Sequence, residues 1–159
     1  MNATRRIATL ALIAGVAGAA SAQTATQSVT FQVDAINQIS FSGSPSLVIN
    51  TATAGSAPTS ATAAATWSVT TNQTGAKITA SIGSAMPAGL TLQVNLGAPA
   101  GASSAGAQTL STTSVDVVTG ITKLAQSAIT LNYSLAATAA AGVVSSTSRT
   151  VTYTITGGT

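Results

Sequence analysis

Leu90-Thr91-Leu92-Gln93-Val94-Asn95-Leu96 is the stretch that decides the fold of this chain. Its apolar residues occupy every second position, and the residues between them are the polar Thr, Gln and Asn. A period of two predicts a β-strand with one face in a core and the other in water. The rest of the chain is therefore best searched for the same alternation.

The same alternation returns at six further places, Ser28–Val33, Ile39–Phe41, Ala65–Val69, Ile78–Ile82, Ile129–Leu135 and Val151–Thr156, and a weaker strand is expected at Val115–Val118. Val, Ile and Thr fill these stretches, as a pleated and half-buried surface favours. Turn-rich segments separate them at 51–64, 84–89 and 97–106, and residues 136–141 are expected to be a helical turn or a loop.

Eight or nine short strands at this spacing predict an all-β fold, a two-sheet antiparallel β-sandwich that is immunoglobulin-like. A closed membrane barrel is the rival architecture, and it calls for aromatic girdles. The chain has five aromatic residues and ends in Gly157-Gly158-Thr159, so the sandwich is the preferred interpretation.

Residues 1–22 have the order of a secretory signal peptide. The Arg5-Arg6 pair gives a positive start, an uncharged apolar run follows, and Ala20-Ser21-Ala22 matches a cleavage site. We expect cleavage between Ala22 and Gln23, which leaves a single domain over 23–159. The apolar run is shorter than the roughly 20 residues of a membrane span. The arginine pair leaves the twin-arginine route open, but the residues after it favour the general secretory route.

The expected mature chain carries very little charge. Its ionisable side chains are Lys77, Lys123, Arg149, Asp34 and Asp116, so the net charge of +3 for the whole chain becomes +1 without the two leader arginines. Three scattered cations predict no nucleic-acid partner. The chain has no cysteine, hence no disulfide and no lipidated N-terminal cysteine, and we expect no transmembrane anchor in the mature chain. We expect a secreted protein, located outside the cell, on its surface or in the periplasm.

Catalytic residue types are missing, since the chain contains no His, Cys or Glu. Neither a Ser-His-Asp nor a Cys-His arrangement can be assembled, and zinc loses its commonest ligands. Asp34 and Asp116 are the one carboxylate pair from which a glycosidase could be built. We interpret them instead as solvated or edge-protecting charges, and predict no enzyme activity, no catalytic or metal-binding residue and no cofactor.

Three further residue patterns have an ordinary structural interpretation. Trp67 is in phase with Ala65 and Val69, which favours a core position over a sugar-stacking platform. An internal cross-link through Lys77 or Lys123 is not expected, because no Glu is present to shuttle the proton. The glycan-acceptor patterns Asn72-Gln73-Thr74 and Asn132-Tyr133-Ser134 are interpreted as chance matches.

The order of these segments is similar to that of secreted sandwich modules of bacterial surfaces. The resemblance rests on Trp67-Ser68-Val69, Leu90–Leu96, Ile129–Leu135, Ala141-Gly142-Val143 and Arg149–Thr156. The closing strand resembles the ends of fimbrial and spore-coat-U-like subunits, and the whole is similar to WxL-type wall-associated domains. The chain differs from the WxL pattern in having Val after Trp-Ser, and from the fimbrial groups in lacking cysteine. The resemblance implies a structural surface role and assembly by strand donation.

We therefore expect a non-catalytic structural or adhesive protein, a pilus-like subunit or adhesin that self-associates through its sheet edges. The alternative is a module that binds carbohydrate or cell wall, with a surface polysaccharide as partner. Residues 23–33 are expected to be an exchangeable arm in which Val29, Phe31 and Val33 fill slots of a neighbouring subunit. The other interpretation, that Ser28–Val33 is the first strand of its own domain, stays open at this point.

Overall fold

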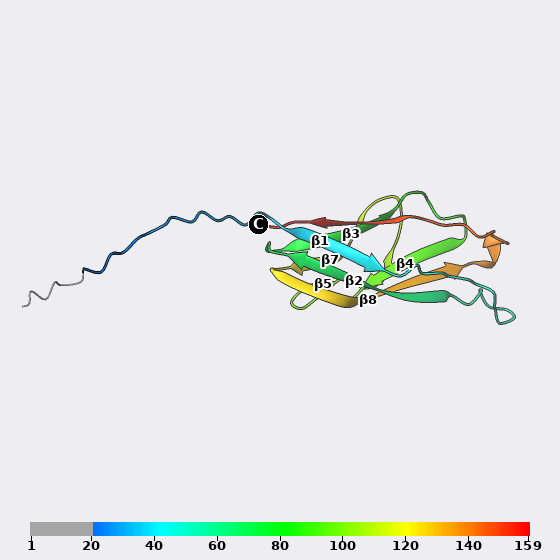
Figure 1. Cartoon of the computed structure of the whole chain (residues 1–159). Coiled ribbons are helices and arrows are strands. Elements are labelled where there is room, and N and C mark those ends of the chain that lie inside the picture. Colours follow the sequence, from blue (N-terminus) through cyan, green and yellow to red (C-terminus); the bar gives the residue numbers. More distant parts are fainter. Residues whose placement is uncertain (1–20) are drawn as a thin grey trace, which may run out of the picture. The chain divides into compact units, whose positions relative to one another are not determined.

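The computed structural model describes residues 21–159, so the predicted signal peptide, with Arg5, Arg6 and Ala20, lies almost wholly outside the described residues. Residues 33–159 form one compact unit, which does not include the described residues 21–32. Over the described range the chain holds nine β-strands and one turn of 3-10 helix, η1 (Ala139–Ala141) (Figure 1). The prediction of an all-β chain is confirmed.

The strands form two antiparallel sheets. The five-stranded sheet has the order β1 (Asn37–Ser42), β2 (Ala61–Thr71), β8 (Leu124–Ala137), β4 (Leu90–Leu96) and β6 (Gln108–Thr109). The four-stranded sheet has the order β5 (Ser103–Ser104), β7 (Val115–Ile121), β3 (Ala76–Ile82) and β9 (Val151–Thr156). Two antiparallel sheets with nine strands are what the spacing of the alternating segments predicts.

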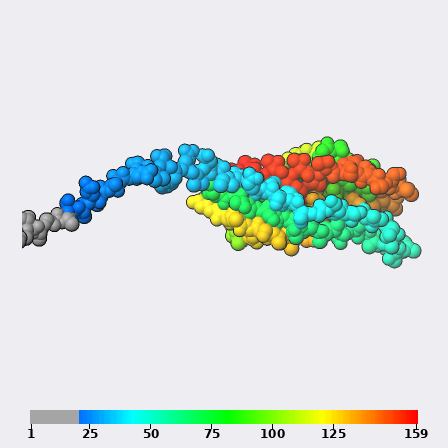
Figure 2. All heavy atoms as spheres, in the orientation of Figure 1, coloured from blue at the N-terminus to red at the C-terminus, as the bar shows by residue number. Residues whose placement is uncertain are grey.

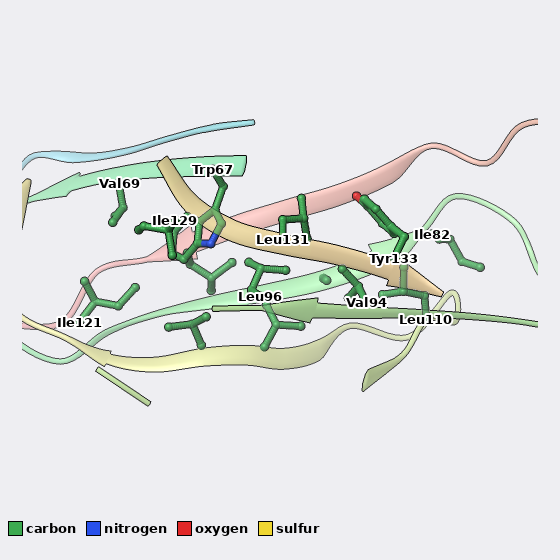
Figure 3. Close-up of a cluster of buried hydrophobic side chains, with 14 of the residues drawn as sticks. Trp67, Val69, Ile82, Val94, Leu96, Leu110, Ile121, Ile129, Leu131 and Tyr133 are labelled. Carbon is green, nitrogen blue, oxygen red and sulfur yellow. The ribbon is translucent and has the colours of Figure 1, made fainter. Parts of the chain in front are cut away.

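Both sheets direct apolar side chains into one shared core. On β4 every second residue from Leu92 on is buried, as the alternation predicts, and the same holds along the whole of β3. Figure 3 shows these side chains pointing from both sheets into the space between them. The largest fully buried members are Trp67, Ile78, Val94, Leu96, Val117, Val118, Ile121 and Leu131. Burying apolar surface contributes about 25 cal/mol per Å², so this cluster is the main stabilising feature of the fold.

Strand β8 contains an irregularity opposite β2. Trp67 lies opposite Ile129, but Val69 lies opposite Gln126, so β8 has one more residue than β2 between these two pairs. Ala128, within that interval, has φ of 55°, in the left-handed region that L-residues other than glycine rarely adopt. This is a β-bulge, which locally bends a strand and increases its twist.

The C-terminus is held on the turn between β2 and β3. Thr74 N donates to Thr159 O at 3.0 Å, and Thr159 N donates to Thr74 O at 3.2 Å. A Cβ atom on Gly158 would overlap the Thr74 carbonyl oxygen, whereas one on Gly157 would meet the end of the Gln73 side chain. Gly158 is therefore required for the close approach of these two backbones.

Three details differ from the expectations or refine them. Ser28–Val33 belongs to no strand of the described chain, because alternation specifies which side chains face alike and does not supply a pairing partner. The two-residue strands β5 and β6 were not predicted; β5 lies inside the segment 97–106 that we interpreted as a turn, and β6 follows it directly. The stretch 136–141 ends β8 and then forms η1, so the helical-turn prediction holds for its second half.

Candidate functional site

The two long edge strands of the sheets, β1 and β9, lie on the same side of the core. The other edges, β5 and β6, have two residues each. The rings of Phe41 on β1 and Tyr153 on β9 stack with centroids 4.1 Å apart, which joins the sheets across this side. Figure 2 shows β1 and the residues after it, in cyan, beside the C-terminal segments in orange to red.

At every second residue of β9, the backbone N–H and C=O groups point away from the neighbouring strand β3. Ile82 of β3 pairs with Val151, yet Ile82 N donates to Ser111 O on the opposite side of β3. Gly83 N donates to Thr150 O, so the hydrogen bond to the segment of β9 is made at the pair Gly83 and Thr150, which adjoins the pair Ile82 and Val151. Because bonded and non-bonded pairs alternate in an antiparallel ladder, Val151, Tyr153 and Ile155 direct their N–H and C=O groups away from β3. These three residues form a free sheet edge, since β9 pairs only with β3 in the described part of the chain.

Four of the five aromatic residues gather beside this edge. Besides the stack with Tyr153, Phe41 lies 6.3 Å from Trp67 between ring centroids. The Tyr133 and Tyr153 hydroxyl groups are 2.7 Å apart, and the hydroxyl of Tyr133 points toward β9 in Figure 3. Burial raises the pKa of Tyr133 and of Tyr153, and for Tyr153 the hydrogen bond with Tyr133 raises the pKa further. The pair is thus a neutral polar link between the two sheets.

A half-open hollow of about 1060 Å³ lies beyond the end of β1. Its apolar lining includes Phe41, Leu47, Val48, Ile49, Met86, Leu90, Leu92, Tyr133, Leu135, Val144, Val151 and Tyr153. Two of its borders, residues 45–52 and 144–149, carry no strand in the structure apart from an isolated bridge at Ala52. The one charged residue of the lining is Arg149, whose Nε donates to Ala85 O at 3.1 Å and whose Nη1 donates to Ser148 O at 2.9 Å. We call this space the edge hollow.

The predicted donor residues are strongly exposed. Val29, Phe31 and Val33 have 74%, 89% and 78% of their surface accessible. They are the apolar half of an extended segment that forms no strand within the described chain. Phe31 is also the one aromatic residue outside the cluster beside β9. The structure therefore does not make Ser28–Val33 the first strand of its own sheet.

The two carboxylates occupy different surroundings. Asp116 lies on β7 and forms an exposed ion pair with Lys77 of β3, at 3.0 Å from Nζ to Oδ1. Asp34 precedes β1, and its carbonyl oxygen accepts a hydrogen bond from Asn72 Nδ2 at 2.8 Å. Asn72 also accepts from Ile36 N through Oδ1, which fixes the chain where it enters β1. The structure thus gives Asp116 a cationic partner and gives Asn72 a structural role.

The other candidates from the sequence are placed as follows. Trp67 is buried, as its phase predicts, and it offers no exposed ring for a sugar. Its indole nitrogen is the one buried side-chain polar atom without a hydrogen-bond partner in the described residues. Asn132 lies on β8, and Lys123 lies in the turn before it. Residues 21–159 contain no group of three potential metal ligands and no helix long and apolar enough to cross a membrane.

The edge hollow is the feature that sequence reasoning missed. Its lining comes from three strands of one sheet, one strand of the other and the segments around them. One signal was present, since Phe41, Tyr133 and Tyr153 each lie in phase with the core residues of their strands. Comparison with protein-family models, with curated proteins and with solved structures finds no match to this chain.

Proposed function

We propose that this protein is a non-catalytic structural subunit of an exported cell-surface assembly. In this assembly, residues 28–33 of one copy add as a strand to an open sheet edge of another copy. The observation that carries the proposal is the exposure of Val29, Phe31 and Val33 on a segment that belongs to no strand of the described chain. We further propose that the strand arrangement is immunoglobulin-like and that the leader 1–22 directs export.

The chemistry of the segment supports strand addition. Ser28–Val33 alternates three polar with three apolar residues and contains no charge, proline or glycine. An added strand gains affinity from main-chain hydrogen bonds and specificity from alternate side chains in pockets. An exposed Phe and two exposed Val in one short segment are a surface that a monomer does not need.

The sheet edges support it as well. Soluble β proteins protect free edges with charged side chains, prolines or bulges. β9 has the sequence Val-Thr-Tyr-Thr-Ile-Thr, which contains none of these charges or prolines. The edge residues Val151, Tyr153 and Ile155 therefore present unpaired backbone groups to an incoming strand.

Removal of the arm tests the proposal. The mature chain Gln23–Thr159 and a chain without residues 23–33 are compared by light scattering and electron microscopy over a range of concentrations. Within residues 21–159 all strands lie between Asn37 and Thr156, so we expect the shortened chain to keep the fold, which circular dichroism checks. We expect assemblies from the mature chain and monomers from the shortened one. A mature chain that stays monomeric at high concentration, or binds polysaccharide without assembling, would refute the proposal and favour the ligand-binding alternative.

A further inference from the structure

We infer that the edge hollow is the acceptor for Ser28–Val33 of a second copy, with Phe31 against the aromatic cluster beside β9. The inference rests on the proposed function and specifies its partner surface. It selects one location among the sheet edges that strand addition could use.

The hollow has room for the segment. In a two-sheet sandwich each strand residue occupies about 3.3 Å along the strand, 4.8 Å across the sheet and 10 Å through the layer, or about 160 Å³. Six residues therefore need about 950 Å³, and the hollow has about 1060 Å³.

The surfaces also match in chemistry. Every second residue of Ser28–Val33 is apolar, and the lining is formed mainly by Leu, Ile, Val, Met and aromatic side chains. The aromatic cluster contains Phe41, Trp67, Tyr133 and Tyr153. Phe31 is the fifth aromatic residue of the chain and the one outside this cluster. Since the segment is uncharged and Arg149 already binds Ala85 O, insertion buries no unpaired carboxylate or ammonium group.

Backbone partners are available at the same place. Val151 and Tyr153 line the hollow, and they belong to the free edge of β9. The border segments 45–51 and 144–149 belong to no strand of the described chain. A strand inserted between them gains hydrogen bonds from β9 on one side at least, which is the requirement for β-augmentation.

The position of the arm favours a second copy as the source of the occupant. Ile36, held by Asn72, marks the end of β1 where the arm begins, and β1 starts beside Thr71. The hollow starts at Phe41, near the other end of β1, about 17 Å away along five strand residues. Donation between copies then joins two different surfaces, the arm of one copy and the hollow of the next, so that subunits can add one after another.

A pair of matched variants tests the acceptor site in the mature chain. Val48 lines the hollow and is 68% exposed, whereas Val143 is 102% exposed and is not part of the lining. Neither side chain is in the core, so Val48→Arg and Val143→Arg both leave the fold intact. We expect Val48→Arg to abolish the assemblies that light scattering detects and Val143→Arg to retain them.

A labelled peptide of residues 23–33 provides the second measurement. Its affinity for the chain without residues 23–33 is measured by fluorescence anisotropy. Burying a Phe side chain contributes enough free energy to change Kd at least about tenfold. We therefore expect Phe31→Ala in the peptide to weaken binding by at least about tenfold. Thr30→Ala, on the opposite face of the strand, should change it by less than about twofold. Val48→Arg in the acceptor should also weaken it at least about tenfold.

The outcomes separate the two proposals. If the assemblies survive removal of residues 23–33, strand donation itself is wrong. If removal abolishes them but Val48→Arg and Val143→Arg assemble alike and bind the peptide equally, donation stands and the hollow is not the acceptor. If the shortened chain binds the peptide while the mature chain stays monomeric, the arm fills its own hollow, and donation between copies is wrong.

Discussion

Replacing Ala128 by glycine should stabilise this protein, although glycine normally weakens a strand. Ala128 has φ of 55° in the bulge of β8. A residue with a Cβ atom loses about 1–2 kcal/mol in that conformation, and glycine does not. Glycine in turn loses about 0.5–1 kcal/mol more backbone freedom on folding than alanine does. The difference predicts that Ala128→Gly raises the free energy of unfolding by about 0.5–1 kcal/mol.

Ala125 provides the matched control on the same strand. It is exposed like Ala128 and, within the described residues, is not among those with positive φ. Ala125→Gly should therefore lower the free energy of unfolding by about 0.5–1 kcal/mol. Urea unfolding followed by circular dichroism measures both variants. If Ala128→Gly destabilises the protein as much as Ala125→Gly does, the bulge does not hold Ala128 in a left-handed conformation and the reasoning is wrong.

Three further predictions concern the tyrosine pair, the C-terminus and the leader. The free energy of unfolding should fall as the pH rises above about 10. Tyrosine ionises there in the unfolded chain, whereas burial raises the pKa of Tyr133 and Tyr153 in the folded protein. Urea titrations should show no such fall from this source when both tyrosines are changed to Phe. Gly158→Ala should lower the free energy of unfolding by about 1–3 kcal/mol through loss of the two hydrogen bonds with Thr74, as measured by urea unfolding. If Gly158→Ala lowers it no more than Gly157→Ala does, the argument that a Cβ atom on Gly158 overlaps the Thr74 carbonyl is wrong. Intact-mass measurement of the secreted protein should show a start at Gln23, and a start more than two or three residues away would refute cleavage after Ala22.

The sequence predicted the fold well where the alternation of side chains is long and regular. Leu90–Leu96 is a strand with the predicted bounds, and the burial of Trp67 follows from its phase with Val69. Hydrophobic burial determines which face of such a strand is inside, so a single strand carries its own signal. β5 and β6 have two residues each, and their pairing depends on β7 and β4 rather than on a local pattern.

The candidate site was only half predictable for the same reason. The alternation at Val29, Phe31 and Val33 marks a segment that suits a strand, but no local pattern states which edge it pairs with. The edge hollow depends on where β1 ends, where β9 begins and how the segments between strands run past them. Those positions follow from the pairing of residues far apart in the chain, such as Phe41 with Trp67.

Trp67 has a practical consequence as the single indole of the chain, fully buried and without a hydrogen-bond partner for its nitrogen. An indole in such apolar surroundings emits at shorter wavelength than one in water, so the native protein should show blue-shifted fluorescence from one defined point of its interior. Unfolding would move that emission to the red, with no second tryptophan to blur the signal. Because the ring of Phe41 stacks with both Trp67 and Tyr153, the same emission reports on the side of the core where the two edge strands meet.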